Sequence, residues 1–505
     1  MSMRAPYSSG CHACRRMKVK CDGKKPQCER CTKARRVCPG YRDAKQVIFC
    51  SMNAGLASKA KTSRLSRARE PTTVAELDDA GGIASASFTP RLLTQPSEMW
   101  DTRAISHFLH NYSFPPTKDS PGYLGFLPDL LGNSSSVQYL ESAVLAAGFA
   151  SLANITGLTY LERTAEKHYG ETLRSISSAL KDPLKASSDG ALAAIVVLQM
   201  YEAISGITNV SGDPHDKGLV ELLRLRGNGR LSTGNGMALL QIIHSRVHVN
   251  SVGGLAPSPI DVKYDAEAVD FPAHQAELWR LMRRTSQCCV EARAMILVQG
   301  RYAFKSEIIN SLDCLYSAYL CLLHWRATSP SSWSYQSCKM PTENHGSQRG
   351  GFPEEYHLFK NIQHGAMWIS FWCTVIYALQ MLVYASSLPV LQQTFNQGRQ
   401  SSWDLKKQLR NAVDDICACV PYMMADVDQS GLPTVGKDGK ALGSYHLLRG
   451  LYVASCVAEL TTVQRDYMMR TFLRIAHGRG IKLALRPRNR WLNRHRDSVA
   501  QHHQI

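Results

Sequence analysis

Acidic residues are scarce at both ends of this 505-residue chain. Residues 1–70 hold 18 Lys and Arg against 4 Asp and Glu, and residues 481–505 hold 6 against 1. Between these ends the two signs are nearly balanced, so the formal net charge of +18 comes from the ends. A neutral body with basic ends is typical of a protein that contacts nucleic acid through an arm.

The sequence also lacks the short motifs that mark common catalytic sites. It contains no glycine-rich phosphate loop, no G-x-S-x-G elbow and no H-E-x-x-H pair. His215, His244 and His248 could in principle line a pocket, but histidines on helices are more often satisfied structural residues. We therefore expect no catalytic residues and no enzymatic activity.

Secretory and membrane signals are equally scarce. No signal peptide precedes the first cysteines, so we expect a reducing compartment and free thiols. One apolar run, residues 366–385, has the length of a membrane span, but Ser370, Thr374 and Gln380 interrupt it. Its neighbours follow similar helical patterns, so we predict a buried core helix and no membrane partner.

Six of the 16 cysteines are concentrated near the N-terminus in a regular pattern. The spacing is C-x2-C-x6-C-x6-C-x2-C-x6-C, and its members are Cys11, Cys14, Cys21, Cys28, Cys31 and Cys38. A step of 17 residues carries the first three onto the last three. A C-x-x-C pair brings two sulfurs to one ion, so this repeat indicates metal rather than disulfides.

The number of ligands indicates two ions that share thiolates. A closed zinc site takes four ligands, so two separate ions need about eight, and six suffice only if two bridge. By the repeat, Cys11 and Cys28 are the natural bridging candidates. Six thiolates and two Zn²⁺ leave a net charge of about −2, which nearby cations would offset.

Lysines and arginines surround these cysteines. The candidate DNA-binding residues are Arg15, Arg16, Lys18, Lys20, Lys24, Lys25, Arg35 and Arg36. The run CHACRRMKVKCDGKKPQCERCTKARRVCPGY, from Cys11 to Tyr41, resembles fungal Zn2Cys6 binuclear-cluster transcription factors. Every cysteine gap is in register, and the loop proline is present as Pro26.

This resemblance implies a fold, a cofactor and a way of binding DNA. All six cysteines would hold two Zn²⁺ ions, with Cys11 and Cys28 bridging. The short helix after the first C-x-x-C would enter the major groove, where Lys18 reads the G edges of a CGG-type triplet. Arg15, Lys20 and basic residues of the second half would hold phosphates. Met17 stands where many relatives carry Arg or Lys.

A linker separates the cysteine-rich segment from the rest. We assign residues 1–45 to the DNA-binding domain and residues 46–96 to a linker, first basic and then flexible. The linker contains no sustained heptad that would form a coiled coil. Residues 97–485 form the next domain, and residues 486–505 form a basic tail.

Helical periodicity dominates after residue 100, and strand alternation is scarce. One stripe is Ala165, Tyr169, Leu173, Ile176 and Leu180, ended at Asp182-Pro183, and residues 192–201 are apolar nearly all round. We predict a large all-α domain with a loop at 329–351. The predicted helices lie near 136–157, 165–180, 192–201, 219–226, 237–250, 273–299, 306–326, 357–386, 404–424, 444–463 and 465–484.

This region also resembles the helical regulatory domain that follows the cluster in one branch of the same family. The matching residues are Ala165, Tyr169, Leu173, Tyr201, Glu202, Gly206, His215, Gly218, Leu222, Leu223, Arg226, Gly227, Gly480, Ile481 and Ala484. The resemblance implies a nuclear regulator of RNA polymerase II transcription for a metabolic or secondary-metabolite gene set. Its partners would be double-stranded DNA and co-regulators or the transcription machinery. A small-molecule effector and a homodimer through the helical domain stay open.

A second hypothesis belongs to a different class. In it, the helical part is an effector-binding or enzymatic protein, and the zinc cluster only tethers it to chromatin.

Overall fold

The chain divides into two compact units, residues 1–91 and residues 92–505. The computed structural model describes residues 11, 13–14, 17, 19, 21–24, 27–34, 36, 38–39, 97–117, 122–132, 137–207, 214–226, 234–254, 272–297, 305–340, 352–389, 391, 402–434 and 439–487. In the first unit, the described helix is α2 (Glu29–Lys33). The predicted linker, residues 46–96, lies outside the described residues, and so does the predicted basic tail except for residues 486 and 487.

The second unit is predominantly helical, as predicted. Its first helices are α4 (Ser97–Tyr112), α5 (Leu127–Gly132), α6 (Val137–Thr156), α7 (Thr159–Ala179), α8 (Pro183–Ala186), α9 (Asp189–Ser205), α10 (Pro214–Arg226) and α11 (Gly234–Gly254). The remaining helices are α12 (Ala273–Leu297), α13 (Lys305–Ala327), α14 (Ile362–Ser386), α16 (Ser402–Ala418), α17 (Val420–Met423), α18 (Ala441–Ser455), α19 (Thr462–Gly478) and η4 (Lys482–Ala484).

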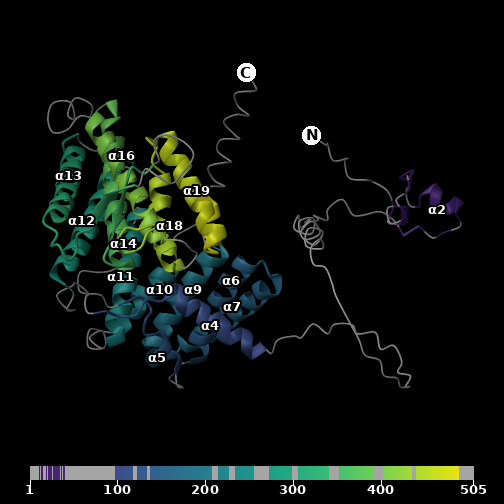
Figure 1. Ribbon diagram of the computed structural model, residues 1–505. Coiled ribbons are helices and arrows are strands. Elements are labelled where there is room, and N and C mark those ends of the chain that lie inside the picture. The colour runs from purple at the N-terminus through teal and green to yellow at the C-terminus, as the bar shows by residue number, and fades with distance from the viewer. Residues whose placement is uncertain are drawn as a thin grey trace, which may run out of the picture. The chain divides into compact units, whose positions relative to one another are not determined.

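Two helices lie at the centre of two packed groups (Figure 1). In the first, α6 packs against α4, α7 and α9. In the second, α14 packs against α12, α13, α16 and α18. The groups are joined where α9 meets α11 and η4, where α4 meets α18, and where α6 meets α19. One contiguous set of buried apolar side chains runs through both groups.

Helix α9 shows why the apolar run at 192–201 is buried. Ser188 caps its N-terminus by accepting a hydrogen bond from the Ala191 N–H at 3.2 Å. Gly206 ends it in the left-handed conformation, at φ +78°. All ten residues of the run are buried, because the helix is covered on every side. Its length and composition, rather than one apolar stripe, predicted this position.

The stripe predicted on α7 is only partly the buried face. Ala165 and Ile176 are buried as expected. In contrast, Leu173 and Leu180 are exposed, at 37% and 41%. The buried stripe is Leu161, Ala165, Thr172, Ile176 and Ala179. Thr172 takes a core position because its hydroxyl donates to the His168 carbonyl oxygen at 2.8 Å, which satisfies its polar group.

The prediction of a loop at 329–351 was wrong for four of its residues. Strand β1 (Gln336–Lys339) pairs antiparallel with β2 (Glu355–Leu358). The predicted helix at 357–386 therefore begins later, at Ile362. There Asn361 caps it by accepting from the His364 N–H at 3.0 Å. The short strands carry no clear alternation, which is why periodicity missed them.

Helix α14 contains the long apolar run that passes the length test for a membrane span. Among the described helices it alone does so, and 72% of its most apolar window is buried inside the domain. Its neighbours α12, α13, α16 and α18 provide that cover. Burial in the domain therefore accounts for its composition.

Several predicted helix ends were also wrong. The span 404–424 is two helices, α16 and α17, that break at Cys419. The predicted helix at 444–463 ends at Ser455, and α19 ends at Gly478 rather than near 484. Gly480 has φ +68°, and a side chain there would meet Ile155 Cγ1 at 3.0 Å, so glycine is needed at this turn.

The residues after Gly480 are held against α6, α7 and α9. Asn154 donates its amide N–H groups to the carbonyl oxygens of Gly480, at 2.7 Å, and Ile204, at 2.8 Å. Lys482 forms an ion pair with Glu162 at 2.8 Å. A further hydrogen bond runs from the Arg486 guanidinium to the Gly206 carbonyl oxygen at 2.9 Å. This C-terminal segment, residues 480–487, is thus part of the folded domain.

Candidate metal centre

The predicted cysteines come together in the N-terminal unit. Five of them are buried there, namely Cys11, Cys14, Cys28, Cys31 and Cys38, and Cys21 is half-buried. The other side chains packed against them are those of Ala13 and Val19. Because so few apolar groups surround the sulfurs, the described part of this unit has almost no hydrophobic core.

Backbone hydrogen bonds repeat with the same step of 17 residues. The Cys14 N–H points to Sγ of Cys11 and the Cys31 N–H to Sγ of Cys28, both at 3.4 Å. Two further matched pairs are Met17 N to Ala13 O (3.1 Å) with Ala34 N to Arg30 O (3.2 Å), and Val19 N to Cys14 O (3.0 Å) with Arg36 N to Cys31 O (2.9 Å). The repeat seen in the cysteine spacing is therefore a repeat of backbone conformation.

The sulfur–sulfur distances fit zinc. Four sulfurs at about 2.3 Å from one ion, at tetrahedral corners, lie about 3.8 Å apart. The observed distances are 3.6 Å for Cys11–Cys28, 3.7 Å for Cys11–Cys31, 3.9 Å for Cys14–Cys28 and 4.0 Å for Cys28–Cys38. A disulfide requires about 2.05 Å, so these sulfurs are arranged for ions and not for bonds to each other.

The sulfurs form two groups of four with two members in common. One group is Cys11, Cys14, Cys21 and Cys28; the other is Cys11, Cys28, Cys31 and Cys38. Within each group all sulfur atoms lie within 4.8 Å of one another. Cys11 and Cys28 belong to both groups, so the arrangement fits two tetrahedral ions that share two thiolates.

The pKa values of the cysteine thiols show what the zinc ions contribute to this site. Burial, together with the neighbouring sulfurs, raises the pKa of Cys14 to about 12. The backbone N–H of Cys11 lowers the pKa of Cys21 to about 7. Zinc binds the thiolate form, so loading the site releases protons and supplies the positive charge that the buried sulfurs lack.

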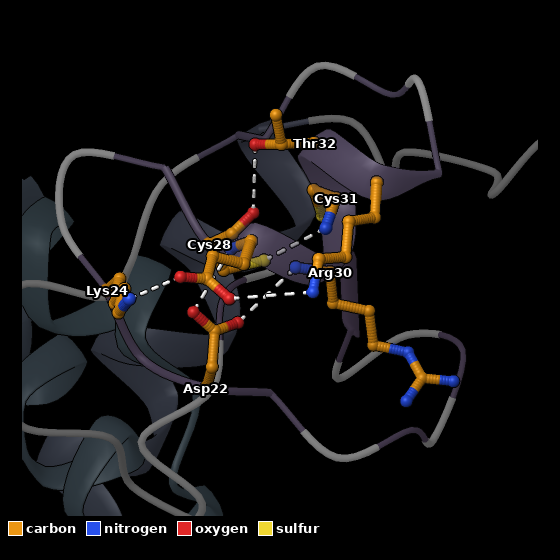
Figure 2. A network of polar contacts seen from close by, with 8 residues as sticks. Asp22, Lys24, Cys28, Arg30, Cys31 and Thr32 are labelled. Atoms are coloured by element: carbon orange, nitrogen blue, oxygen red, sulfur yellow. Dashed lines mark hydrogen bonds and ion pairs between the residues drawn. The ribbon is translucent and has the colours of Figure 1, made fainter.

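Asp22 organises the start of α2, beside the metal centre (Figure 2). Its carboxylate accepts from the N–H groups of Glu29, at 3.1 Å, and Arg30, at 3.4 Å. The hydrogen bond from the Glu29 N–H is the main reason why the pKa of Asp22 is lowered. Lys24 closes the network through an ion pair with Glu29, and Thr32 donates to the Cys28 carbonyl oxygen at 3.2 Å.

The role of Asp22 could not be predicted from the sequence. The N-cap of α2 is Cys28, and Asp22 lies seven residues before Glu29, where a helix cap gives no local sequence signal. Asp22 has no counterpart one repeat away, since residue 5 is Ala and residue 39 is Pro. The two halves therefore differ at this point.

The structure describes two of the predicted DNA-binding residues. Lys24 pairs with Glu29, as above, with its side chain 66% exposed. Arg36 crosses to the first half, where its guanidinium lies 2.7 Å from Sδ of Met17. The other six, Arg15, Arg16, Lys18, Lys20, Lys25 and Arg35, lie outside the described residues.

Comparison with known families assigns this unit. Residues 9–47 match the fungal Zn(2)-Cys(6) binuclear cluster domain. This segment is a fungal Zn2Cys6 domain. The resemblance inferred from the cysteine spacing is confirmed, and with it two Zn²⁺ ions per chain as the cofactor of the Zn2Cys6 domain.

One curated relative reaches beyond the Zn2Cys6 domain. The chain is 26% identical over 230 residues to the "Phomenoic acid biosynthesis cluster-specific transcriptional regulator" of Leptosphaeria maculans. The similar region covers 44% of this chain and 42% of that protein, so the chain matches less than half of its relative. No solved structure matches the chain.

Proposed function

We propose that this protein is a nuclear, sequence-specific DNA-binding regulator of transcription by RNA polymerase II. In this proposal, residues 1–45 bind DNA, residues 46–96 form the linker, and residues 97–485 form the regulatory domain. The observation that carries this proposal is the pair of four-sulfur groups sharing Cys11 and Cys28, within a segment rich in Lys and Arg. The curated relative supports control of a metabolic or secondary-metabolite gene set.

All six cysteines are the proposed zinc ligands, with Cys11 and Cys28 as the bridges. Metal counting tests the bridges directly. Cys11→Ser removes a ligand from both ions, whereas Cys21→Ser, the matched control, removes one from a single ion. We expect Cys11→Ser to lose both zincs and Cys21→Ser to retain more metal. Equal loss from the two variants would contradict bridging by Cys11.

The proposed DNA contacts are of two kinds, contacts to base edges and contacts to phosphates. Lys18 reads G bases of a CGG-type triplet, while Arg15, Arg16, Lys20, Lys24, Lys25, Arg35 and Arg36 hold phosphates. The two halves differ at the base-reading position, because the step of 17 residues places Arg35 of the second half where the first half has Lys18. Lysine donates to O6 and N7 of G, and contacts to phosphate fix the register.

Selection of bound sites from random DNA, followed by titration of variants, tests this division. Lys18→Ala should relax preference at one G position and cost about 1–3 kcal/mol of binding free energy. Arg15→Ala should weaken all sequences alike and reduce the salt slope by about one phosphate contact. Uniform loss of affinity in both variants would show that Lys18 does not read bases.

Stoichiometry follows from the size of the Zn2Cys6 domain. One such domain contacts about three base pairs, and the heptads that would pair two copies are missing from the linker. We propose one chain per single-triplet duplex for residues 1–70, with strong salt dependence from the basic residues 59–69. Sedimentation on such a duplex tests this, and a tight two-chain complex would contradict it.

The regulatory partners stay predictions. Contacts with co-regulators or the transcription machinery, a small-molecule effector and a homodimer would all involve the helical domain. Ligand-induced stabilisation of the full chain distinguishes an effector from a scaffold. The second hypothesis, a tethered enzyme, requires turnover of a substrate by the helical domain.

A further inference from the structure

The β-hairpin of the helical domain places a serine opposite a histidine. In the antiparallel register, Ser337 of β1 faces His357 of β2. Directly opposed residues point to the same side of a two-stranded sheet. The neighbouring Tyr356 points to the other side, where its hydroxyl donates to the Gly431 carbonyl oxygen at 2.9 Å. Ser337 and His357 therefore share the face that looks toward α16.

Two hydrogen bonds extend this pair to a carboxylate. Ser337 Oγ lies 3.0 Å from Nδ1 of His357, and Nε2 of His357 lies 3.0 Å from Oδ1 of Asp415 on α16. An ionised carboxylate only accepts, so Nε2 carries the proton. In the neutral ring Nδ1 is then the acceptor, and the Ser337 hydroxyl must donate. The two hydrogen bonds therefore run in one direction: Ser337 donates to His357, and His357 donates to Asp415.

The neighbouring side chains fix His357 in place and leave Ser337 exposed to solvent. His357 is only 4% exposed, and the Tyr335 ring lies 4.2 Å from its ring, centroid to centroid. Asp415 is oriented by α16, whose adjacent Asp414 accepts from Gln464 Nε2 at 2.7 Å. Ser337 itself is exposed. The histidine is thus buried and fixed, while reagents reach the serine from solvent.

We propose that Ser337 is an activated nucleophile that accepts acyl groups from carboxylic esters. A serine hydrogen-bonded to a histidine, which a third group orients, is the arrangement that activates a hydroxyl. His357 acts as the general base, and Asp415 is a positioning residue that fixes the tautomer and stabilises the imidazolium. This activity is additional to DNA binding and does not depend on it.

The reaction balances without a further reactant. Oγ of Ser337 attacks the ester carbonyl carbon, its proton passes to Nδ1 of His357, and the carbon–oxygen bond to the alcohol breaks. The imidazolium returns the proton to the departing alkoxide, leaving an acyl-serine and a free alcohol. Water then attacks the acyl-serine, with its proton passing through Nδ1, and releases a carboxylic acid and the original hydroxyl.

Labelling of the zinc-loaded full chain with a fluorophosphonate probe tests the proposal. The probe forms a phosphorus–oxygen bond to an activated serine and loses fluoride. We expect peptide mass spectrometry to find the label on Ser337, and at least about 100-fold slower labelling in His357→Asn, which removes the base. Ser337→Ala abolishes the signal. Ser334→Ala is the matched control, because Ser334 is exposed on the same segment and donates only to a backbone oxygen.

Asp415→Asn tests the positioning role and keeps the proposal falsifiable if His357→Asn does not fold. We expect slower labelling with an unchanged melting temperature and an altered pH–rate profile, because the carboxylate that fixes the tautomer of His357 is gone. Hydrolysis of p-nitrophenyl acetate should follow the same order of variants. Labelling of Ser337 no faster than Ser334, or labelling unaffected by either substitution, would overturn the proposal.

Discussion

Among the described residues, the buried side chains of the Zn2Cys6 domain are cysteines, whereas those of the helical domain are overwhelmingly aliphatic and aromatic. A segment of about forty residues buries too little apolar surface to fold unaided. Metal–ligand bonds supply the missing free energy. The helical domain needs no such device, because helices such as α9 and α14 are buried on nearly every side. One chain therefore depends on two sources of stability that respond to different treatments.

Metal removal is the strongest way to separate the two regions. A chelator should unfold the Zn2Cys6 domain and abolish DNA binding, because structural zinc contributes about 10 kcal/mol or more. The calorimetric transition of the helical domain should stay in place. Metal analysis should return two zincs per chain before treatment. A single zinc, or DNA binding that persists in chelator, would contradict this prediction.

Truncation of a buried side chain in the helical domain should destabilise that domain and leave the Zn2Cys6 domain unchanged. Phe371 is fully buried and its ring lies 5.3 Å from that of Trp368 and 4.9 Å from that of Trp372. Phe371→Ala should lower the free energy of unfolding of the helical domain by about 3–5 kcal/mol, with the zinc content unchanged. Tyr384→Ala, on the same helix but 44% exposed, is the control and should cost about 0.5 kcal/mol or less. Denaturant titration measures both.

Acid should weaken the helical domain through buried neutral histidine. Burial, aided by Arg283, lowers the pKa of His244 to about 3, against 6.5 for an ordinary histidine. The unfolded chain therefore binds this proton near pH 6.5 and the folded chain does not, so stability falls as the pH falls from about 6.5 to 3. At pH 5 the loss from this residue is roughly 2 kcal/mol.

Removing the histidine tests that sign. His244→Gln should flatten the dependence of unfolding free energy on pH between 7 and 5. His324→Gln is the control, because His324 is exposed on α13. Equal slopes for His244→Gln and the unsubstituted protein would locate the acid sensitivity elsewhere.

The smallest effect concerns a helix cap. Thr461 accepts from the Gln464 N–H at 3.2 Å, and Gln464 Oε1 accepts from the Thr461 N–H at 2.9 Å, which forms a capping box on α19. Thr461→Ala should cost about 1 kcal/mol. Thr461→Ser retains the hydroxyl and should cost less. An unchanged melting temperature for Thr461→Ala would show that packing alone fixes α19.

Sequence reasoning worked best where chemistry fixes spacing. Cysteines separated by two and six residues constrain both the ion and the backbone, so the metal centre was predictable. The contact of Asp22 with the start of α2 was not, because Asp22 lies seven residues before Glu29 and only the fold brings them together. In the helical domain, apolar periodicity predicted most helices. It failed for α7, where Leu173 and Leu180 follow the period but face solvent, because periodicity does not show which side a neighbour covers.

Short elements were hidden for a different reason. Each strand of the hairpin has four residues, fewer than a pattern needs to stand out. The start of α14 was available from Asn361 directly before an apolar run, a known cap signal. The contact between Ser337, His357 and Asp415 was not, since these residues are 20 and 58 positions apart and only the fold brings them together.

The attachment of residues 480–487 has a genetic consequence. A nonsense change just upstream of Gly480 would remove the Gly480 carbonyl oxygen that accepts from Asn154 and the Lys482 partner of Glu162, and it would uncover the ends of α6 and α9. The Zn2Cys6 domain would be translated intact from the same message. Such an allele would encode an intact Zn2Cys6 domain joined to a damaged helical domain.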